Sequence, residues 1–339
     1  MIAVEIDNVT KSFGRHVAVA DLCLRVPQGS VYGFIGPNGS GKTTTLRMIM
    51  RILHPDRGHI RVLGEEKYGA ANDRVGYLPE ERGLYKQMRV RDLLRFYAQL
   101  KGHRPGRQEI DDWLSRLFPD QDPLRIGGLK IEALSKGMSQ KVQFIATVIA
   151  RPLLVLLDEP FSGLDPVNAD VLRELVLDLR RNGTTVIFST HDMTVAEQLC
   201  DAIFMIYRGR KVLDGPLREI QQEHGRDVIR VRLDCDGRPM PRLDDLPGVV
   251  GVTEFGNYQE LRTSPDADAQ QILTALMCRG RVEHFEIAHP SLQDIFRRIA
   301  QPAGVEPKGS DAAEQKGSGQ VRCASPVGGL SASHGAEAP

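Results

Sequence analysis

A glycine-rich segment, GPNGSGKTT, occupies residues 36–44 between the apolar run SVYGFIG and the helical pattern TTTLRMIMRIL. The pattern G-x-x-x-x-G-K-[ST] between a strand and a helix is typical of a phosphate-binding loop, in which glycines let backbone N–H groups approach the phosphates. The helix that follows adds the positive end of its dipole. The chain is therefore expected to fold as an α/β sheet with a nucleotide site at this junction.

Each residue type in this loop suits one task at a nucleotide. Lys42 is expected to neutralise the charge of the β- and γ-phosphates, and Thr43 to offer its hydroxyl to Mg²⁺. The other loop residues expected at the nucleotide are Gly36, Pro37, Asn38, Gly39, Ser40, Gly41 and Thr44. A flexible glycine turn is the alternative, and the strand and helix patterns on either side disfavour it.

A second motif, LLVLLDEP, combines an apolar strand with two adjacent acids at its end. Such a strand delivers its carboxylates to the same edge of the sheet as the phosphate loop. Asp158 is expected to hold Mg²⁺ or its water, and Glu159 to act as general base on the attacking water. A solvated pair of strand-end acids is the alternative interpretation.

The sequence pattern divides the chain into three parts. Residues 1–220 alternate strand and helix patterns, with a charged helical insertion at 90–117. Residues 226–300 have the strand and helix patterns of a small α+β domain. Residues 301–339 are mostly Gly, Ala, Ser, Pro and scattered charge, which bury too little apolar surface to fold, so this tail is expected to be disordered.

Charge and hydropathy limit the classes of partner. Lys plus Arg and Asp plus Glu number 44 each among 339 residues, so no basic excess favours nucleic acid as a partner. No apolar run approaches the ~18 residues of a membrane span, and the first residues lack the pattern of a secretory signal. Any membrane role is therefore expected to depend on a partner.

A third motif, LSKGMSQ, covers residues 134–140. Ser135 is expected to cap the helix that follows, and with Gly137 it would form a second anion-binding helix terminus. One nucleotide already has its phosphate loop, so this second terminus needs a different explanation. Taken alone, the motif is no more than a helix cap.

The order of these motifs resembles that of the nucleotide-binding subunits of ABC transporters. LSKGMSQ is similar to the family's signature sequence, and SGLDP is similar to its D-loop, with Asp165 at the matching position. His191 matches the switch histidine that contacts the γ-phosphate, and Phe13 the aromatic residue that stacks on adenine. The resemblance covers residues 2–220 and implies a P-loop ABC ATPase core with an antiparallel β subdomain and a helical insertion.

The signature departs from the family pattern at two positions. Lys136 stands where the family usually has Gly, and Met138 where it often has Gln. The resemblance then leaves Ser135 and Gly137 as the residues expected at the γ-phosphate.

Glu80, in VGYLPEERGLY, stands where most family members have Gln. The resemblance gives this position a place beside Mg²⁺, the attacking water and the membrane partner, so Glu80 is expected to be a metal ligand with a part in catalysis. The alternative is that Glu80 pairs with Arg82 in a solvated turn. PEERGLY also resembles a sodium-efflux-like exporter branch whose ATPases carry a small C-terminal domain, and HPSLQDIF fits the end of that domain.

The resemblance implies an ATPase of the cytoplasmic membrane face that powers an exporter. Two ATPase subunits, identical or different, would enclose two ATP molecules with Mg²⁺ in a head-to-tail dimer, and separate transmembrane permease subunits would carry the substrate. A soluble ABC ATPase that acts in a non-transport process is the alternative function, and a nucleotide-dependent scaffold with little turnover is a third. The retention of Glu159 and His191 argues against the scaffold.

Overall fold

The computed structural model describes residues 1–66, 72–81, 83–224, 228–234, 241–256, 258–264, 266–288 and 290–300. The tail expected to be disordered, 301–339, lies outside the described residues. Arg82, the alternative partner of Glu80, also lies outside them.

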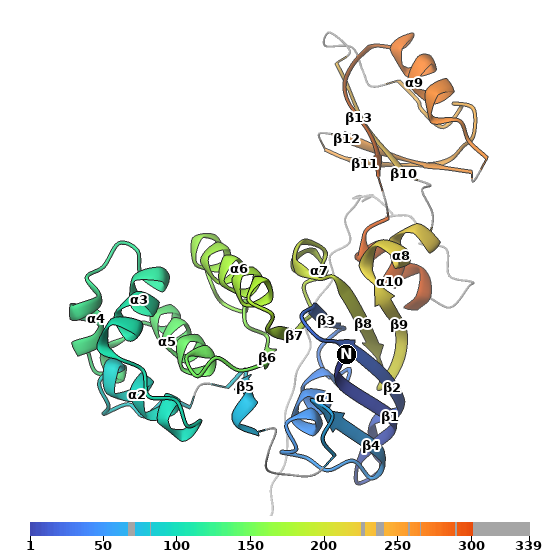
Figure 1. The fold of residues 1–339 in the computed structure, drawn as a ribbon. Helices are drawn as coiled ribbons and strands as arrows, with labels where there is room; N and C mark the ends of the chain where they lie inside the picture. Colours follow the sequence, from blue (N-terminus) through green and yellow to red (C-terminus); the bar gives the residue numbers. More distant parts are fainter. Residues whose placement is uncertain are drawn as a thin grey trace, which may run out of the picture. The chain divides into compact units, whose positions relative to one another are not determined.

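The central sheet has six strands in the order β5-β6-β7-β3-β8-β9 (Figure 1). The first five are parallel and β9 returns antiparallel to β8. Every residue of β3, β6 and β7 is buried, which explains their apolar sequences. The strands are β3 (Val31–Ile35), β5 (Val75–Leu78), β6 (Leu154–Asp158), β7 (Thr185–Thr190), β8 (Ala202–Tyr207) and β9 (Arg210–Pro216).

The parallel register brings the ends of three strands together at one edge. Ile35 of β3 pairs with Thr190 of β7, and Asp158 of β6 pairs with Ser189 of β7. The residues that follow these strands are the phosphate loop, Glu159 and His191. Ligands of α/β sheets bind outside the carboxyl ends of the strands, so the fold assembles the expected nucleotide residues at this edge.

A second, antiparallel sheet has the order β2-β1-β4 and forms the expected antiparallel subdomain. Its strands are β1 (Ile2–Phe13), β2 (His16–Pro27) and β4 (Arg57–Val62). The first two strands are longer than the short alternating runs in the sequence suggest, because bulges in their pairing shift the register and interrupt the alternation. Strand β4 is rich in charge, and its sequence alone gives no strand signal.

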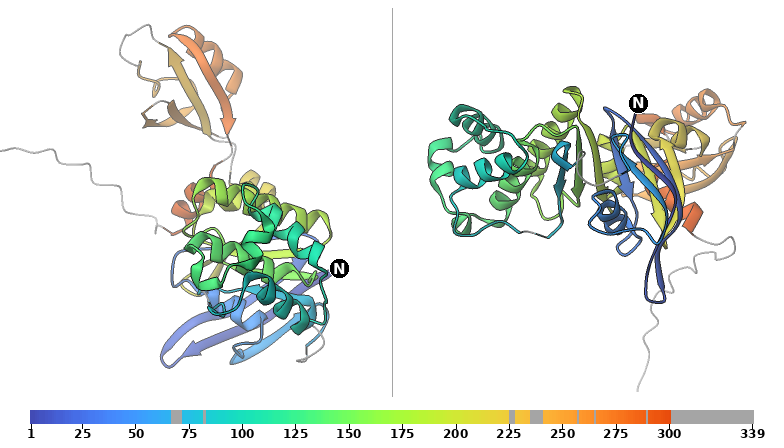
Figure 2. Two further views of the ribbon diagram at one scale, coloured as in Figure 1. Left: turned by 90° about the vertical axis from the view of Figure 1, so that its left-hand side faces the viewer. Right: turned by 60° about the horizontal axis from the view of Figure 1, so that its bottom comes forward.

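The helical insertion consists of α2 (Val90–Leu100), α3 (Arg107–Leu117), α4 (Pro123–Gly128) and α5 (Lys136–Val148). These helices form one cluster in each view (Figure 2). They share a core in which Leu93, Leu114 and Phe144 are fully buried. The remaining helices of the cassette are α1 (Lys42–Ile49), α6 (Pro166–Arg181), α7 (Met193–Leu199) and α8 (Leu217–Glu223).

The C-terminal part has an antiparallel sheet of order β11-β12-β10-β13. Alternate residues Ile229, Val231 and Leu233 face a core shared with helix α9. The elements are β10 (Val228–Asp234), β11 (Val249–Phe255), β12 (Tyr258–Thr263), α9 (Ala269–Met277), β13 (Arg281–Ala288) and α10 (Leu292–Ala300). This is the α+β arrangement expected from the sequence, while the proposed boundary at residue 220 falls inside α8 and stays a prediction.

Candidate nucleotide-binding site

The phosphate loop packs tightly against its neighbours, and two glycines make this possible. A Cβ atom at Gly36 would lie 2.2 Å from the carbonyl oxygen of Ile206, and one at Gly41 would lie 2.6 Å from that of Ala18. Gly41 also has φ 112° and precedes α1 without a side-chain cap. The first N–H groups of a helix have no partner within it, so the start of α1 is suited to an anion.

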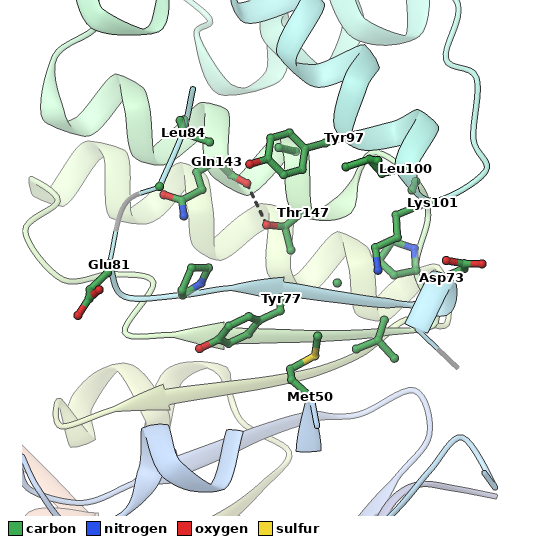
Figure 3. A pocket seen from close by; sticks show the side chains of 17 residues that line it. Met50, Asp73, Tyr77, Glu81, Leu84, Tyr97, Leu100, Lys101, Gln143 and Thr147 are labelled. Atoms are coloured by element: carbon green, nitrogen blue, oxygen red, sulfur yellow. Dashed lines mark hydrogen bonds between the residues drawn. The ribbon is translucent and has the colours of Figure 1, made fainter. Parts of the chain in front are cut away.

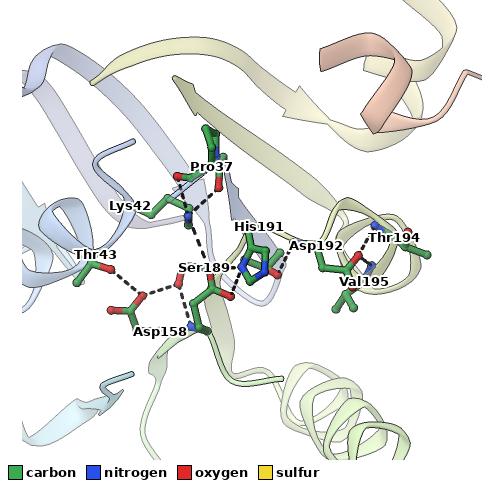
Figure 4. Close-up of polar contacts among 12 residues, drawn as sticks. Pro37, Lys42, Thr43, Asp158, Ser189, His191, Asp192, Thr194 and Val195 are labelled. Atoms are coloured by element: carbon green, nitrogen blue, oxygen red, sulfur yellow. Dashed lines mark hydrogen bonds and ion pairs between the residues drawn. The ribbon is translucent and has the colours of Figure 1, made fainter. Parts of the chain in front are cut away.

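Lys42 is buried at the centre of this loop (Figure 4). Its Nζ donates to the carbonyl oxygens of Gly36 at 2.7 Å and Pro37 at 3.2 Å, and lies 3.7 Å from Oε1 of Glu159. Burial lowers the pKa of the Lys42 ammonium, and the nearby carboxylates of Glu159, Asp158 and Glu80 oppose that shift. A positive charge is therefore held in the loop at a desolvation cost, where phosphate oxygens could approach it.

Asp158 ends β6 with only 1% of its surface exposed. Its Oδ1 accepts hydrogen bonds from Thr43 Oγ1 at 3.1 Å and from Ser189 Oγ at 2.5 Å. Its Oδ2 is buried and has no hydrogen-bond partner among the described residues. A buried carboxylate oxygen without a partner is costly, so this atom is a candidate ligand for a cation.

Glu159 leaves the strand in a left-handed conformation, with φ 49°. Its backbone N–H donates to Ser189 Oγ at 2.9 Å, which supports this turn. The carboxylate lies 3.0 Å from Nδ1 of His191 and 3.7 Å from Nζ of Lys42. Glu159 is therefore placed between two groups that can carry positive charge.

His191 follows β7 and keeps 54% of its side chain exposed. The next residue, Asp192, caps α7 by accepting from the N–H groups of Thr194 at 2.9 Å and Val195 at 3.3 Å. The N–H of Asp192 in turn donates to Thr190 Oγ1 at 3.0 Å. These bonds fix the turn on which the imidazole is carried (Figure 4).

Glu80 lies two residues after the end of β5, beside the same region. It lines a cavity of about 170 Å³ together with Asp158, Glu159 and Lys136. Gln140 also lines this cavity, and its Nε2 donates to the carbonyl oxygen of Pro160 at 2.5 Å. Three carboxylates thus border one small space, although among the described residues no group of three His, Cys, Asp or Glu side chains is arranged to hold a metal ion by itself.

Four other expected site residues, Ser135, Gly137, Asp165 and Phe13, do not line the cavity of Glu80. Ser135 accepts from the Met138 N–H at 3.2 Å as the cap of α5, and Asp165 accepts from the Asn168 N–H at 3.0 Å as the cap of α6. No hydrogen bond of the described residues links Ser135 or Asp165 to the phosphate loop. Phe13 is half exposed at the end of β1.

Two residues of the site have no role in the sequence expectations. Ser189 bridges Asp158 and the backbone of Glu159, and Gln140 lines the cavity of Glu80. The only local signal for Ser189 is a polar residue in the buried strand that ends beside His191. Gln140 lies within LSKGMSQ, in which only Ser135 and Gly137 are expected at the nucleotide.

Comparison with known protein families matches two parts of the chain. Residues 19–162 match the family model described as ABC transporter. Residues 215–300 match the model described as ATP-binding protein DrrA1-3-like, C-terminal domain.

Individual relatives agree with this assignment. The chain is 40% identical over 294 residues to YhaQ of Bacillus subtilis, an uncharacterized ABC transporter ATP-binding protein, covering 86% of this chain and 96% of the relative. It is 32% identical to a Nod factor export ATP-binding protein I of Paraburkholderia xenovorans, covering 88% and 96%. A solved ATP-binding subunit of an ABC transporter aligns with TM-score 0.59 and 28% identity, covering 65% of this chain and 92% of that one.

The chain belongs to the ATP-binding subunits of ABC transporters. It is an ATPase, as both the family and the resemblance in its sequence indicate. ABC ATPase subunits bind ATP and work with membrane permease components. Within the part of the chain that the structure describes, no helix has the length and apolar character to cross a membrane.

Proposed function

We propose that this chain powers an ABC exporter and that Glu159 is the general base for ATP hydrolysis. One observation carries the assignment: the Glu159 carboxylate lies 3.0 Å from His191 Nδ1 and 3.7 Å from Lys42 Nζ, beside the phosphate loop. Glu159 would accept a proton from water as the water oxygen bonds to the γ-phosphorus and ADP leaves. General-base catalysis typically contributes ~10²–10⁴ in rate.

The neighbouring groups would orient and neutralise the reactants. Lys42 would exchange its bonds to the loop carbonyls for phosphate oxygens, and the remaining loop residues would hold the phosphates through their N–H groups. His191 would hold the Glu159 carboxylate and reach the γ-phosphate from its exposed face. Phe13, half exposed on β1, would stack on the adenine.

The oxygen atoms of the site fit Mg²⁺. Asp158 Oδ2 is buried and lacks a hydrogen bond among the described residues, and the Thr43 hydroxyl lies 3.1 Å from the other oxygen of the same carboxylate. Glu80 borders the same space. These three residues would hold the ion, which when bound neutralises charge on the phosphate oxygens.

A second ATPase subunit, either a copy of this chain or a related one, would complete the site. Ser135 and Gly137 begin α5, and Asp165 begins α6, yet in one chain they serve only as helix ends. The start of α5 is suited to an anion. Head-to-tail pairing would bring this surface to the γ-phosphate bound by the other subunit.

A groove beside the helical insertion is the proposed docking site for a separate permease subunit (Figure 3). It has a volume of about 370 Å³ and is lined by apolar side chains such as Leu84, Tyr97 and Leu100, with the charges of Asp73 and Lys101 at its side. An amphipathic helix of a permease suits such a groove. Docking there would hold the chain at the cytoplasmic face of the membrane.

The assignment is tested by the variant Glu159→Gln, with the exposed Glu174→Gln on α6 as the matched control. Glu159→Gln is expected to bind ATP, to remain dimeric with ATP in size-exclusion chromatography, and to hydrolyse it at least ~10²-fold more slowly. Glu174→Gln is expected to match the unmodified chain. Wild-type turnover in Glu159→Gln would refute the role of this residue.

A further inference from the structure

The last helix of the described chain, α10, packs against the nucleotide-binding cassette. Leu292 and Ile295 are fully buried in a cluster that includes Ala196 of α7 and Ile35 of β3. Phe296 meets the ring of Tyr207 edge to face, with centroids 5.6 Å apart. The apolar face of α10 is therefore buried on the cassette.

Helix α10 begins within the segment SLQDIF, directly after Ser291. Ser291 Oγ accepts from the N–H of Asp294 at 3.1 Å, as an N-cap does, and donates to Asp294 Oδ2 at 2.5 Å. The N–H of Leu292 donates to Oε1 of Glu197 on α7. One free N–H at the start of α10 is thus satisfied by a carboxylate from another helix, and the positive end of the helix dipole favours that charge.

The carboxyl of Glu197 is partly buried, so a hydrogen-bond donor beside it stabilises its charged form. Burial raises the pKa of the Glu197 carboxyl, and the hydrogen bond from Leu292 opposes that shift. Without the Leu292 N–H, the carboxylate would lose this compensation in the same partly apolar place. The Leu292 N–H is therefore one of two groups, with the charge of Arg230, that stabilise the Glu197 carboxylate in this place.

The same short helix carries the catalytic turn at its other end. His191 lies immediately before Asp192, the cap of α7, and Glu197 lies little more than one turn further along. Met193 and Ala196 of α7 lie in the cluster that contains Leu292. A displacement of α10 would therefore be transmitted through α7 to the turn that holds His191 beside Glu159.

We propose that Glu197 is a positioning residue: it latches α7 to the C-terminal helix α10 and so sets the placement of His191. This inference rests on the role proposed above for His191. It gives the C-terminal part a means to regulate hydrolysis without any phosphate-binding or paired-acid motif of its own. Changes in the C-terminal part would alter turnover through the latch while leaving the phosphate loop intact.

The test uses the full chain with Glu197→Ala, which removes the acceptor, and Glu197→Gln, which keeps an oxygen acceptor without the charge. Glu219→Ala, at an exposed position on α8, is the matched control. Glu197→Ala is expected to lower kcat about threefold to tenfold with the KM for ATP within about twofold, and Glu197→Gln to restore part of the loss. Glu219→Ala is expected to change neither.

Two measurements separate positioning from a loss of fold. Amide hydrogen exchange of the ATP-free chain is expected to speed up in residues 193–199 in Glu197→Ala and to stay unchanged in α1. In a His191→Ala background, Glu197→Ala is expected to cause no further loss of kcat, because the two residues act through one contact.

Unchanged exchange in residues 193–199, or losses of kcat that multiply in the double variant, would overturn the latch. If His191→Ala alone retained wild-type turnover, the role proposed for His191 would fail instead. The exchange experiment would still report whether Glu197 holds α7, so the two failures are distinguishable.

Discussion

Glu80 and Glu81 are adjacent in the chain, yet they line different cavities. Glu80 lines the small cavity that contains Asp158 and Glu159, whereas Glu81 lines the larger groove with Tyr97 and Lys101 (Figure 3). Pro79 and Gln143 line both spaces and so form the wall between them. A single turn of chain therefore connects the proposed hydrolysis site to the proposed permease site.

Lys42→Ala is expected to abolish ATP binding without destabilising the ATP-free chain. Removal of the ammonium relieves its desolvation cost but takes a donor away from the carbonyl oxygens of Gly36 and Pro37, so the two effects on stability oppose each other. Isothermal titration with ATP would show the lost affinity, and thermal unfolding would show a melting temperature that is little changed. The exposed Lys86→Ala is the control; ATP affinity within twofold of wild type in Lys42→Ala would contradict the assignment.

Asp158→Asn is expected to change the stability of the chain little without Mg²⁺ and to remove its response to the ion. The amide oxygen can keep the bonds from Thr43 and Ser189, while the NH₂ group replaces the buried oxygen that has no partner among the described residues. The free energy of unfolding is expected to change by no more than about 1 kcal/mol, because the lost buried charge is offset by a buried NH₂ group in the same place and by the lost attraction to Lys42.

The measurement for Asp158→Asn is urea unfolding with ATP, with and without Mg²⁺. The unmodified chain is expected to gain stability from Mg²⁺ through linked binding, and the variant is not. An equal gain in both proteins would show that the ion binds elsewhere.

Ser189→Ala is expected to remove one hydrogen bond from each of the adjacent acids Asp158 and Glu159. Ser189 Oγ donates to Asp158 Oδ1 and accepts from the N–H of Glu159, which has a left-handed backbone. The loss of two buried hydrogen bonds is expected to cost about 1–3 kcal/mol of unfolding free energy and to lower kcat more than ATP affinity. Ser115→Ala, at an exposed position on α3, serves as the control; a normal kcat in a destabilised Ser189→Ala would limit Ser189 to a structural role.

The sequence predicted the phosphate loop and the acid pair because each lies within a few consecutive residues. The phosphate loop requires only a strand end followed by a helix start, and the acid pair requires only a strand end. Buried strands such as β6 can be recognised from their continuous apolar sequences. Membership of the family, the fold class and the ATPase activity expected from these motifs are confirmed. The individual roles of the site residues stay predictions.

Contacts between distant segments could not be predicted in this way. Ser189 reaches Asp158 only because β7 lies beside β6 in one particular register. Glu197 and Leu292 are 95 positions apart, and nothing in the type of either residue predicts that the two are in contact. Strand β4 and helix α8 were missed because charged, half-exposed segments carry weak periodicity.

Substitutions of Glu80 and Glu81 test how the proposed hydrolysis site is connected to the proposed permease groove. Glu80→Gln keeps an oxygen ligand but removes a negative charge from the cavity that also holds Asp158 and Glu159, so less Mg²⁺ is expected to be retained. The Mg²⁺ concentration for half-maximal ATPase activity is therefore expected to rise about threefold or more, with ATP affinity in the absence of Mg²⁺ unchanged. Glu81→Gln alters only the groove and is expected to leave the basal Mg²⁺ curve unchanged.

With the permease subunit added, the stimulation of ATPase activity is expected to be lower in Glu81→Gln than in Glu80→Gln. Glu81→Gln is expected to reduce the stimulation of ATPase activity by the permease, because Glu81 lines the proposed docking groove. Glu80→Gln is expected to keep its docking affinity and to carry its altered Mg²⁺ dependence into the complex. ATPase rates over a Mg²⁺ series, with and without the permease, measure both effects. If Glu80→Gln gave the wild-type Mg²⁺ curve, or if the two variants gave the same curves in both conditions, the division of roles across Pro79 and Gln143 would be wrong.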